Sequence, residues 1–104
     1  KTKMVVTEAP TYKILIGEVA SDEMMPDELD RLNEVVYENK SGNKKYFTVG
    51  SYASLEAAKQ QLFKYKYDPK NKSFKVVGMY KGSVVSKEIA IDLMNRFMLS
   101  KKSK

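Results

Sequence analysis

Two of the side chains that most often do chemistry in proteins are missing from this chain. Its 104 residues contain no cysteine and no histidine. Without them the common nucleophile–base pairs cannot be built, and zinc-type sites lose their preferred ligands. Asp27, Glu28, Asp30 and Glu34 gather in one segment, but a helix start and a solvated helix face explain them better than paired catalytic carboxylates do. The sequence therefore predicts a protein that is not an enzyme and that holds neither a metal ion nor a cofactor.

The side chains suited to binding alternate with apolar ones along strand-like segments. Successive side chains of a strand point to opposite faces of its sheet. If Ile14, Ile16, Phe47, Val49, Phe74 and Val76 face a core, then Gly17, Gly50, Val77 and the predicted binding residues face away from it. The predicted binding residues are Lys13, Leu15, Tyr37, Asn39, Tyr46, Thr48 and Lys75. Aromatic rings cover the apolar faces of sugars while amides and hydroxyls bond to their edges, so this set suits a neutral or mildly acidic polysaccharide.

The segments that carry these residues have patterns typical of strands, helices and turns. β-branched and aromatic residues predict strands over 12–19 and 70–80, and a short return strand over 83–85. Apolar stripes predict a helix over 21–36 and a second that begins at Leu55 and stops by Asp68. Turn residues at 41–43 predict a hairpin between 35–40 and 44–50. A last helix follows Ser86, and its expected buried face consists of Ile89, Leu93, Met94 and Phe97.

A short phrase built around glycine occurs three times, at Ile16–Ser21, Val49–Ser54 and Val77–Gly82. We interpret each copy as the end of a strand, where the missing Cβ permits close packing or a bend. In the first two copies a helix follows, which makes two strand–helix units. Together they predict an α+β fold, a ferredoxin-like or RNP-like split β-α-β sandwich. Its antiparallel sheet carries two helices on one face, with a short C-terminal β-hairpin and a helix in addition.

Composition and charge bound the class of protein. With 42% hydrophobic and 31% charged residues, the chain has the composition of an ordinary globular domain. No run approaches the roughly 20 apolar residues of a membrane helix. The formal net charge is +6, but five positive charges lie near the ends, at Lys1, Lys3, Lys101, Lys102 and Lys104. We therefore expect an N-terminal arm or linker over 1–11, a domain over 12–98 and a basic tail over 99–104, without a basic face for nucleic acid.

Three segments carry a resemblance to a known family. "YKILIGEV" (12–19) resembles the opening strand of SPOR domains, and "KKYFTVGSYASLEAAKQQLFKYK" (44–66) resembles their second half. "SFKVVGMYKGSVVSKEIAI" (73–91) resembles the last strand and glycine-turn extension of SPOR-like domains of Bacteroidetes type. The likeness covers about residues 12–92.

The resemblance implies a noncatalytic module that binds peptidoglycan, specifically glycan strands stripped of their stem peptides, on its sheet. It also implies a place in the periplasm or cell envelope of a Gram-negative bacterium, in a cell-division or other envelope protein that is tethered to the membrane by a segment outside this chain. The sequence departs from the family pattern in its first strand. Leu15 stands where the family often has glutamine, Glu18 where it has a small residue and Val19 where it has an aromatic one. These departures weaken the expected sugar site.

Two alternatives stay open beside the glycan-binding interpretation. The same fold could serve as a protein-interaction module of the cell envelope that has lost its sugar site. The split β-α-β sandwich is also the fold of RNA-recognition motifs, whose third strand presents two aromatic rings for base stacking. Here Tyr46 is followed two positions later by Thr48 instead of a second ring, so we rank RNA binding last.

Overall fold

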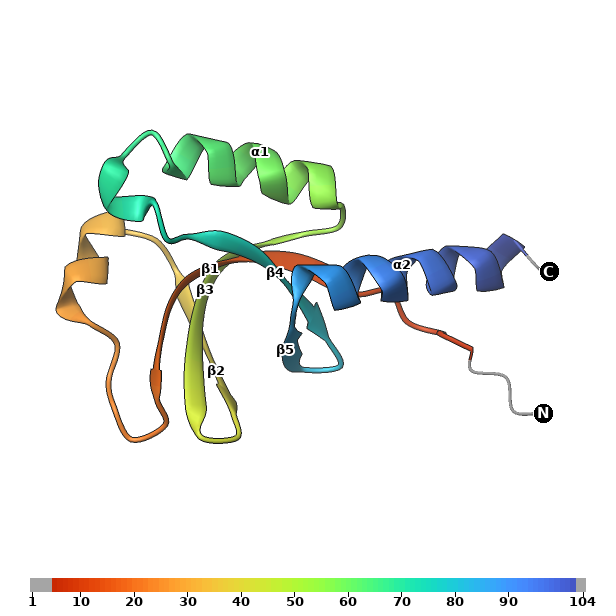
Figure 1. Ribbon diagram of the computed structural model, residues 1–104, viewed down its shortest axis with the longest axis horizontal. Coiled ribbons are helices and arrows are strands. Elements are labelled where there is room, and N and C mark those ends of the chain that lie inside the picture. The colour runs from red at the N-terminus through yellow and green to blue at the C-terminus, as the bar shows by residue number, and fades with distance from the viewer. Residues whose placement is uncertain (1–4, 103–104) are drawn as a thin grey trace.

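A computed structural model describes residues 5–102 of the chain as a single antiparallel sheet with helices packed on it (Figure 1). The strands are β1 (Thr11–Ala20), β2 (Val36–Ser41), β3 (Lys44–Tyr52), β4 (Lys75–Tyr80) and β5 (Ser83–Val85). The helices are α1 (Leu55–Tyr65) and α2 (Lys87–Lys102), with 3-10 turns η1 (Asp27–Leu32) and η2 (Pro69–Asn71). Residues 1–4 and 103–104, which include three of the terminal lysines, lie outside the described part.

The strand order confirms the predicted α+β fold. The sheet runs β2-β3-β1-β4-β5 with every pair antiparallel, which is the order of a split β-α-β sandwich with one extra edge strand. α1 lies across one face, in contact with β1, β3 and β4 (Figure 1). The hairpin predicted around Gly42 joins β2 to β3, and Gly42 has the positive φ of 62° that its turn requires.

The first connection is less helical than its apolar pattern predicts. Over 21–36 only the 3-10 helix η1 forms, and it ends at Asn33, whose φ is 51°. Two features shorten the helix: Pro26 fixes an extended entry, and Val36 is drawn into β2, where it pairs with Val49. The predicted stripe nevertheless faces the core, because Leu29 is buried and Met25 and Leu32 pack beside it.

The core lies between the sheet and the elements on its helical face. Ile14, Ile16, Phe47, Val49 and Phe74 are buried there, as the strand alternation predicts. A second group, with Tyr12, Ala58, Val76 and Ala90, joins the sheet to α1 and α2. Ser54 caps α1 by accepting a hydrogen bond from the N–H of Ala57, and Ser86 does the same for α2 with Ile89.

A β-bulge at Ile16 changes the face to which the next residue points. Leu15 pairs with Thr48 but Gly17 pairs with Phe47, so one residue of β1 has no partner between them. Ile16 and Gly17 therefore both face the helical side, and a Cβ on Gly17 would lie 3.2 Å from a methyl carbon of Leu29. The prediction that Gly17 faces the open side of the sheet was wrong, because simple alternation does not survive a bulge.

The far face of the sheet is curled and not flat. The two edge strands β2 and β5 contact each other although three strands separate them in the sheet order. Leu15, Thr48 and Val77 point to this face yet are buried, and Thr48 has no exposed surface. The expectation that Leu15, Thr48 and Val77 face solvent was therefore wrong. They point away from α1 as predicted, but the curled sheet shields them itself.

The three glycine phrases do not end their strands. β1, β3 and β4 each continue beyond the glycine, to Ala20, Tyr52 and Tyr80. Gly17 makes room for Leu29, Gly50 adopts a φ of 72°, and Gly78 lies so close to α2 that an added Cβ would be 2.4 Å from the Cβ of Ala90. The similar phrases thus meet three different steric demands.

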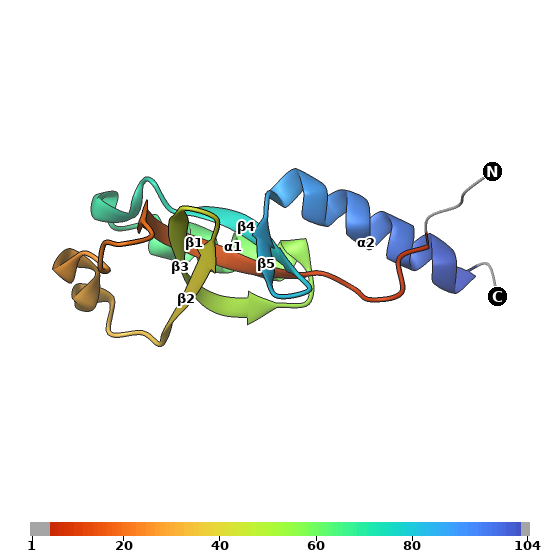
Figure 2. The ribbon, with the colours of Figure 1, turned by 90° about the horizontal axis from the view of Figure 1, so that it is seen from below.

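The C-terminal helix is longer than predicted, and it buries a different face from the one that the sequence predicts. It continues into the segment expected as a basic tail. Ala90, Ile91 and Met94 pack against the core, whereas Ile89 is exposed. The predicted buried face was therefore wrong at Ile89, because the close contact with Gly78 turns Ala90 inward. Figures 1 and 2 show α2 extending past the sheet beside the N-terminal segment, in which Val6 and Pro10 are buried.

Candidate functional site

Three of the predicted binding residues lie together on the β2–β3 hairpin. Asn39 pairs with Tyr46 across the two strands, and Tyr37 pairs with Thr48 two residues farther from the hairpin turn. Because residues two apart in a strand share a face, Tyr37, Asn39 and Tyr46 all lie on the concave face of the curled sheet. The ring of Tyr37 is half exposed, and Tyr46 and Asn39 are partly exposed. We call these three side chains the hairpin row.

Lys13 of β1 adjoins the hairpin row. Its Nζ lies 4.4 Å from the centroid of the Tyr37 ring and donates a hydrogen bond of 3.1 Å to the carbonyl oxygen of Gly50. Burial lowers the pKa of the Lys13 amine below its ordinary value. A second shift in the β1–β3 register, between Tyr12 and Ile14, leaves one extra residue of β3 at Gly50–Ser51. The Gly50 carbonyl that Lys13 binds belongs to this irregular segment, so the irregularity helps to place the amine. Lys13 and Tyr37 thus form one amine–ring unit at the edge of the row.

Leu15 and Thr48 are buried and present almost no side-chain surface to a ligand. Leu15 is 6% exposed and Thr48 is fully covered. Within the described part of the chain, the Thr48 hydroxyl oxygen finds no hydrogen-bond partner. These two predicted site residues lie beside the hairpin row, Thr48 opposite Tyr37 and Leu15 opposite Thr48, but they offer almost no contact surface.

Lys75 is exposed but separate from the hairpin row. It pairs with Leu15 on the opposite side of β1 from β3, so β1 and β3 both lie between it and β2. It borders a hollow of about 240 Å³ that Glu18 and Ser73 also line. The structure consequently brings together Lys13, Tyr37, Asn39 and Tyr46 and leaves Lys75 elsewhere.

The charge of Glu18 is neutralised by a neighbouring lysine. Its carboxylate lies 3.0 Å from the Nζ of Lys44 and accepts a hydrogen bond from it. This hydrogen bond and the charge of Glu18 raise the pKa of Lys44. Glu18 pairs with Tyr46, so the ion pair lies at the end of the hairpin row. The first-strand carboxylate therefore adds no uncompensated negative charge to the face.

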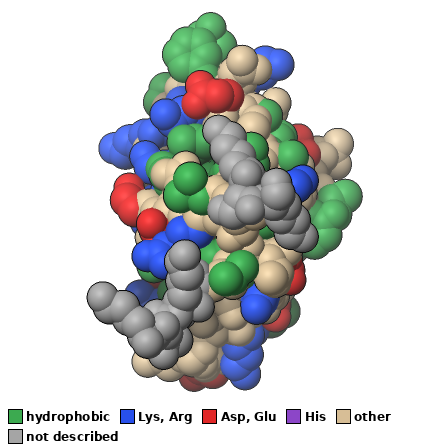
Figure 3. Space-filling view, turned by 90° about the vertical axis from the view of Figure 1, so that its right-hand side faces the viewer, with side chains coloured by type: hydrophobic (Ala, Val, Ile, Leu, Met, Phe, Trp, Pro, Cys, Tyr) green, Lys and Arg blue, Asp and Glu red, His purple; other side chains and the backbone are tan. Residues whose placement is uncertain are grey.

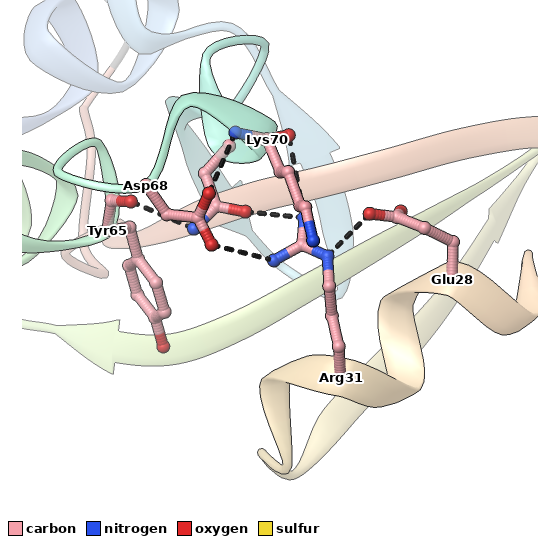
Figure 4. Close-up of polar contacts among 6 residues, drawn as sticks. Glu28, Arg31, Tyr65, Asp68 and Lys70 are labelled. Carbon is pink, nitrogen blue, oxygen red and sulfur yellow. Dashed lines mark hydrogen bonds and ion pairs between the residues drawn. The ribbon is translucent and has the colours of Figure 1, made fainter.

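A polar cluster that the sequence did not reveal joins η1 to η2 (Figure 4). The guanidinium of Arg31 donates to the carboxylate of Glu28 and to Oδ1 of Asn71, at 2.5 and 2.6 Å, and lies 3.7 Å from the carboxylate of Asp68. Asn71 is buried and donates in turn to the carbonyl oxygen of Tyr65. Because the polar groups of the cluster bind one another across η1 and η2, we infer that the cluster stabilises these two connections.

A second feature missed by sequence reasoning is a groove of about 440 Å³ between α1, β4 and the start of α2. Four lysines and one glutamate line it, together with Leu62, Val76, Val77 and Ser86. The charged residues are Lys59, Lys66, Lys75, Lys87 and Glu88. The seven-residue spacing of Lys59 and Lys66, which puts both on one face of a helix, was the sequence signal for this groove.

Other classes of site have no support in residues 5–102. Among them no group of three or more Asp and Glu side chains could hold a metal ion, and no helix is long and apolar enough to cross a membrane. Seen from the end of the molecule at which α2 extends past the sheet, lysine and arginine side chains are spread among acidic and hydrophobic ones (Figure 3). Comparison with known proteins finds no matching protein family, curated protein or solved structure.

Proposed function

We propose that the chain is a noncatalytic glycan-binding module whose ligand is the peptidoglycan glycan strand of a bacterial cell envelope. The observation that carries the proposal is the hairpin row beside Lys13. A half-exposed tyrosine ring, an amide, a second tyrosine and an amine lie on one concave face. Each of these groups suits one part of an N-acetylated sugar: rings for its apolar faces, and amide and amine for its hydroxyl and acetamide edges.

The extended form of the hairpin row supports a linear polymer as the ligand. The row spans two successive same-face positions of the hairpin, at Tyr37 and at the Asn39–Tyr46 pair, so it offers successive contacts along the strands. Leu15 and Thr48 beside it are buried and offer a ligand no hydrogen bonds. In this proposal the sugar site is smaller than the resemblance implies, and it depends on the edge hairpin more than on the centre of the sheet.

Binding to insoluble peptidoglycan sacculi, with and without amidase treatment to remove stem peptides, tests the proposal. We expect the wild-type protein to sediment with treated sacculi more than with untreated ones. Tyr37→Ala should weaken this binding about tenfold, since loss of a stacking ring and its buried area removes on the order of 1–2 kcal/mol.

Tyr67→Ala is the matched control. Tyr67 follows α1 and is as solvent-accessible as a binding ring would be, but it lies outside the hairpin row. Failure of the wild-type protein to bind either preparation of sacculi would overturn the proposal. An equal loss of binding in Tyr37→Ala and Tyr67→Ala would also overturn it.

The burial of Leu15 and Thr48 also favours the second candidate, a protein-interaction module of the cell envelope. In that case sacculi are not bound, and a specific envelope protein co-purifies with the chain. A set of partners that varies between preparations and disappears with detergent would count against this candidate.

A further inference from the structure

The groove between α1, β4 and the start of α2 contains an unpaired strand edge. β5 pairs with β4 only over Gly78–Tyr80. On that side of β4, Lys75, Val76 and Val77 have no strand partner in the described residues. These same three residues line the groove. An unpaired edge presents backbone N–H and C=O groups that an extended peptide can use.

The side chains around this edge define what such a peptide should contain. Leu62 and Val76 give the groove an apolar lining, and Lys59, Lys66, Lys75 and Lys87 surround it. None of these four lysines forms an ion pair with another described residue. Four lysines against the single carboxylate of Glu88 leave a strong excess of positive charge.

The start of α2 adds to this positive potential. The first N–H groups of an α-helix have no partner within the helix. Ser86 accepts from Ile89 through its hydroxyl and from Ala90 through its carbonyl oxygen. The N–H groups of Lys87 and Glu88 have no acceptor in the described residues, and both residues line the groove. In Figure 1 the first turn of α2 lies beside β4, below α1.

We propose that this groove binds a short, extended, acidic peptide segment of a partner protein, which adds as a strand to the free edge of β4. Its backbone pairs with Lys75–Val77, its apolar side chains pack on Leu62 and Val76, and its carboxylates lie among the lysines. A small inorganic anion would use the lysines but neither the strand edge nor the apolar lining, so the peptide accounts for more of the groove. The groove is separate from the hairpin row, and this proposal does not depend on glycan binding.

Fluorescence anisotropy with a labelled six-residue peptide of two central valines flanked by two glutamates on each side tests the proposal, because this order places a valine between two glutamates on either face of an added strand. We expect Lys59→Glu and Lys87→Glu each to weaken its binding about tenfold, since each reversal turns one attraction into a repulsion. Lys64→Glu is the matched control, because Lys64 is an exposed lysine of α1 that does not line the groove. It should leave binding within about twofold of the wild type.

The backbone contribution is tested with the same peptide methylated at alternate amide nitrogens. If the peptide adds as a strand, methylation of the amides that face β4 abolishes binding, and the backbone amide NMR signals of Lys75–Val77 shift when the unmodified peptide binds. Equal binding of both peptides, competition by pyrophosphate at the same concentration as the peptide, or an equal loss in Lys64→Glu would overturn the proposal. Absence of any peptide binding at millimolar concentration would do so too. Sacculus binding is measured on the same variants and is expected to be unchanged.

Discussion

Neighbouring residues of β3 show how strongly a shift of one position along a strand changes the burial of a side chain. Tyr46 is partly exposed on the concave face, Phe47 is buried against the helical face, and Thr48 is buried under the curl of the sheet. Only the difference between Tyr46 and Phe47 follows from alternation. The burial of Thr48 depends on strands that are distant in the sequence.

Replacing Phe47 and Tyr46 by alanine should therefore have opposite effects. Phe47→Ala removes a buried ring and is expected to lower the free energy of unfolding by about 3–5 kcal/mol. Tyr46→Ala should lower it by less than about 1 kcal/mol and should weaken glycan binding instead. Urea denaturation and sacculus sedimentation of the two variants check this. If Tyr46→Ala unfolds the domain while Phe47→Ala only lowers binding, the two faces have been interchanged.

Thr48→Val is expected to keep or raise stability. The Thr48 hydroxyl is fully buried and finds no partner in the described residues, and such a group costs on the order of 1–3 kcal/mol. Valine has nearly the same shape without the polar atom, so the free energy of unfolding should rise by about 1 kcal/mol. Thr11→Val, on the same face but partly exposed, serves as the comparison. A loss of more than about 1 kcal/mol in Thr48→Val would mean that the hydroxyl has a bonding partner in solution.

The ionisation of Tyr65 should make stability depend on pH in the alkaline range. Burial first, and then the nearby carboxylate of Glu34, raise the pKa of Tyr65 from 10.0 to about 12. Because the pKa is raised in the folded state, the contribution of protonated Tyr65 to the free energy of unfolding is fully present below about pH 10. It is lost as the pH rises through about 12. Stability should therefore fall over this interval, because the unfolded chain releases the proton first.

Tyr65→Phe isolates this contribution, since phenylalanine can keep the edge-on ring contact with Phe74. Urea denaturation at several pH values should show a smaller alkaline decrease for Tyr65→Phe than for the wild type. The raised pKa of Tyr12 and the lowered pKa of Lys13 are common to both proteins and cancel in the comparison. Tyr52 stays in both proteins, and its charge is the smallest of the causes that raise the pKa of Tyr65. Identical pH profiles would contradict the assignment.

At the scale of elements, the connections are held to the sheet by contacts of different kinds. The Arg31 cluster joins η1 to η2 through hydrogen bonds, with the Arg31 guanidinium at its centre (Figure 4). α2 is held instead by the close approach of Ala90 to Gly78. Steric fit thus orients α2, and hydrogen bonding orients the 3-10 turns.

Gly78→Ala should weaken the docking of α2. The new Cβ would lie 2.4 Å from the Cβ of Ala90 and 2.9 Å from a methyl carbon of Val85, too close for either to remain in place. Overpacking of this kind costs on the order of 1–3 kcal/mol. In the double variant Gly78→Ala/Ala90→Gly, loss of the opposing Cβ should recover part of that cost. A double-mutant cycle measured by urea denaturation checks this, and strictly additive effects would show that the two residues do not meet.

Much of the element order could be predicted from local sequence, and the exceptions have identifiable physical causes. Ser54, Ser86 and the turn at Gly42 act over a few residues, so the caps and the hairpin were predicted correctly. The bulge at Ile16 arises from the fit of β1 to β3, which are separated in sequence by the first connection and by β2. The rotation of α2 likewise depends on Gly78, which lies in another element. Contacts between segments that are distant in the sequence produce no periodic pattern in either segment.

For the whole molecule, the curl of the sheet is the feature with the largest consequence. Contact between β2 and β5 converts the predicted open binding face into a concave one whose centre is closed. Of the seven predicted site residues, the curl groups Lys13 with the hairpin row, buries Leu15 and Thr48 and leaves Lys75 near a basic groove. The lysine groove was missed because the spacing of Lys59 and Lys66 indicates only one wall of it, and the residues of β4 and α2 that complete the groove are distant in sequence.

Leu15→Gln tests whether this curled arrangement persists in solution. If the sheet were flat, glutamine at this position would lie on an open face, cost little and strengthen sugar binding through its amide. In the curled sheet Leu15 is 6% exposed, so the amide would be buried without an evident partner. We therefore expect Leu15→Gln to lower the free energy of unfolding by about 2–4 kcal/mol without any gain in sacculus binding.

Lys75→Gln is the control, because Lys75 pairs with Leu15 across the strands and is exposed, so its substitution should change stability by less than about 0.5 kcal/mol. A stable Leu15→Gln protein that binds sacculi more tightly than the wild type would show that the sheet opens at its centre to receive the glycan.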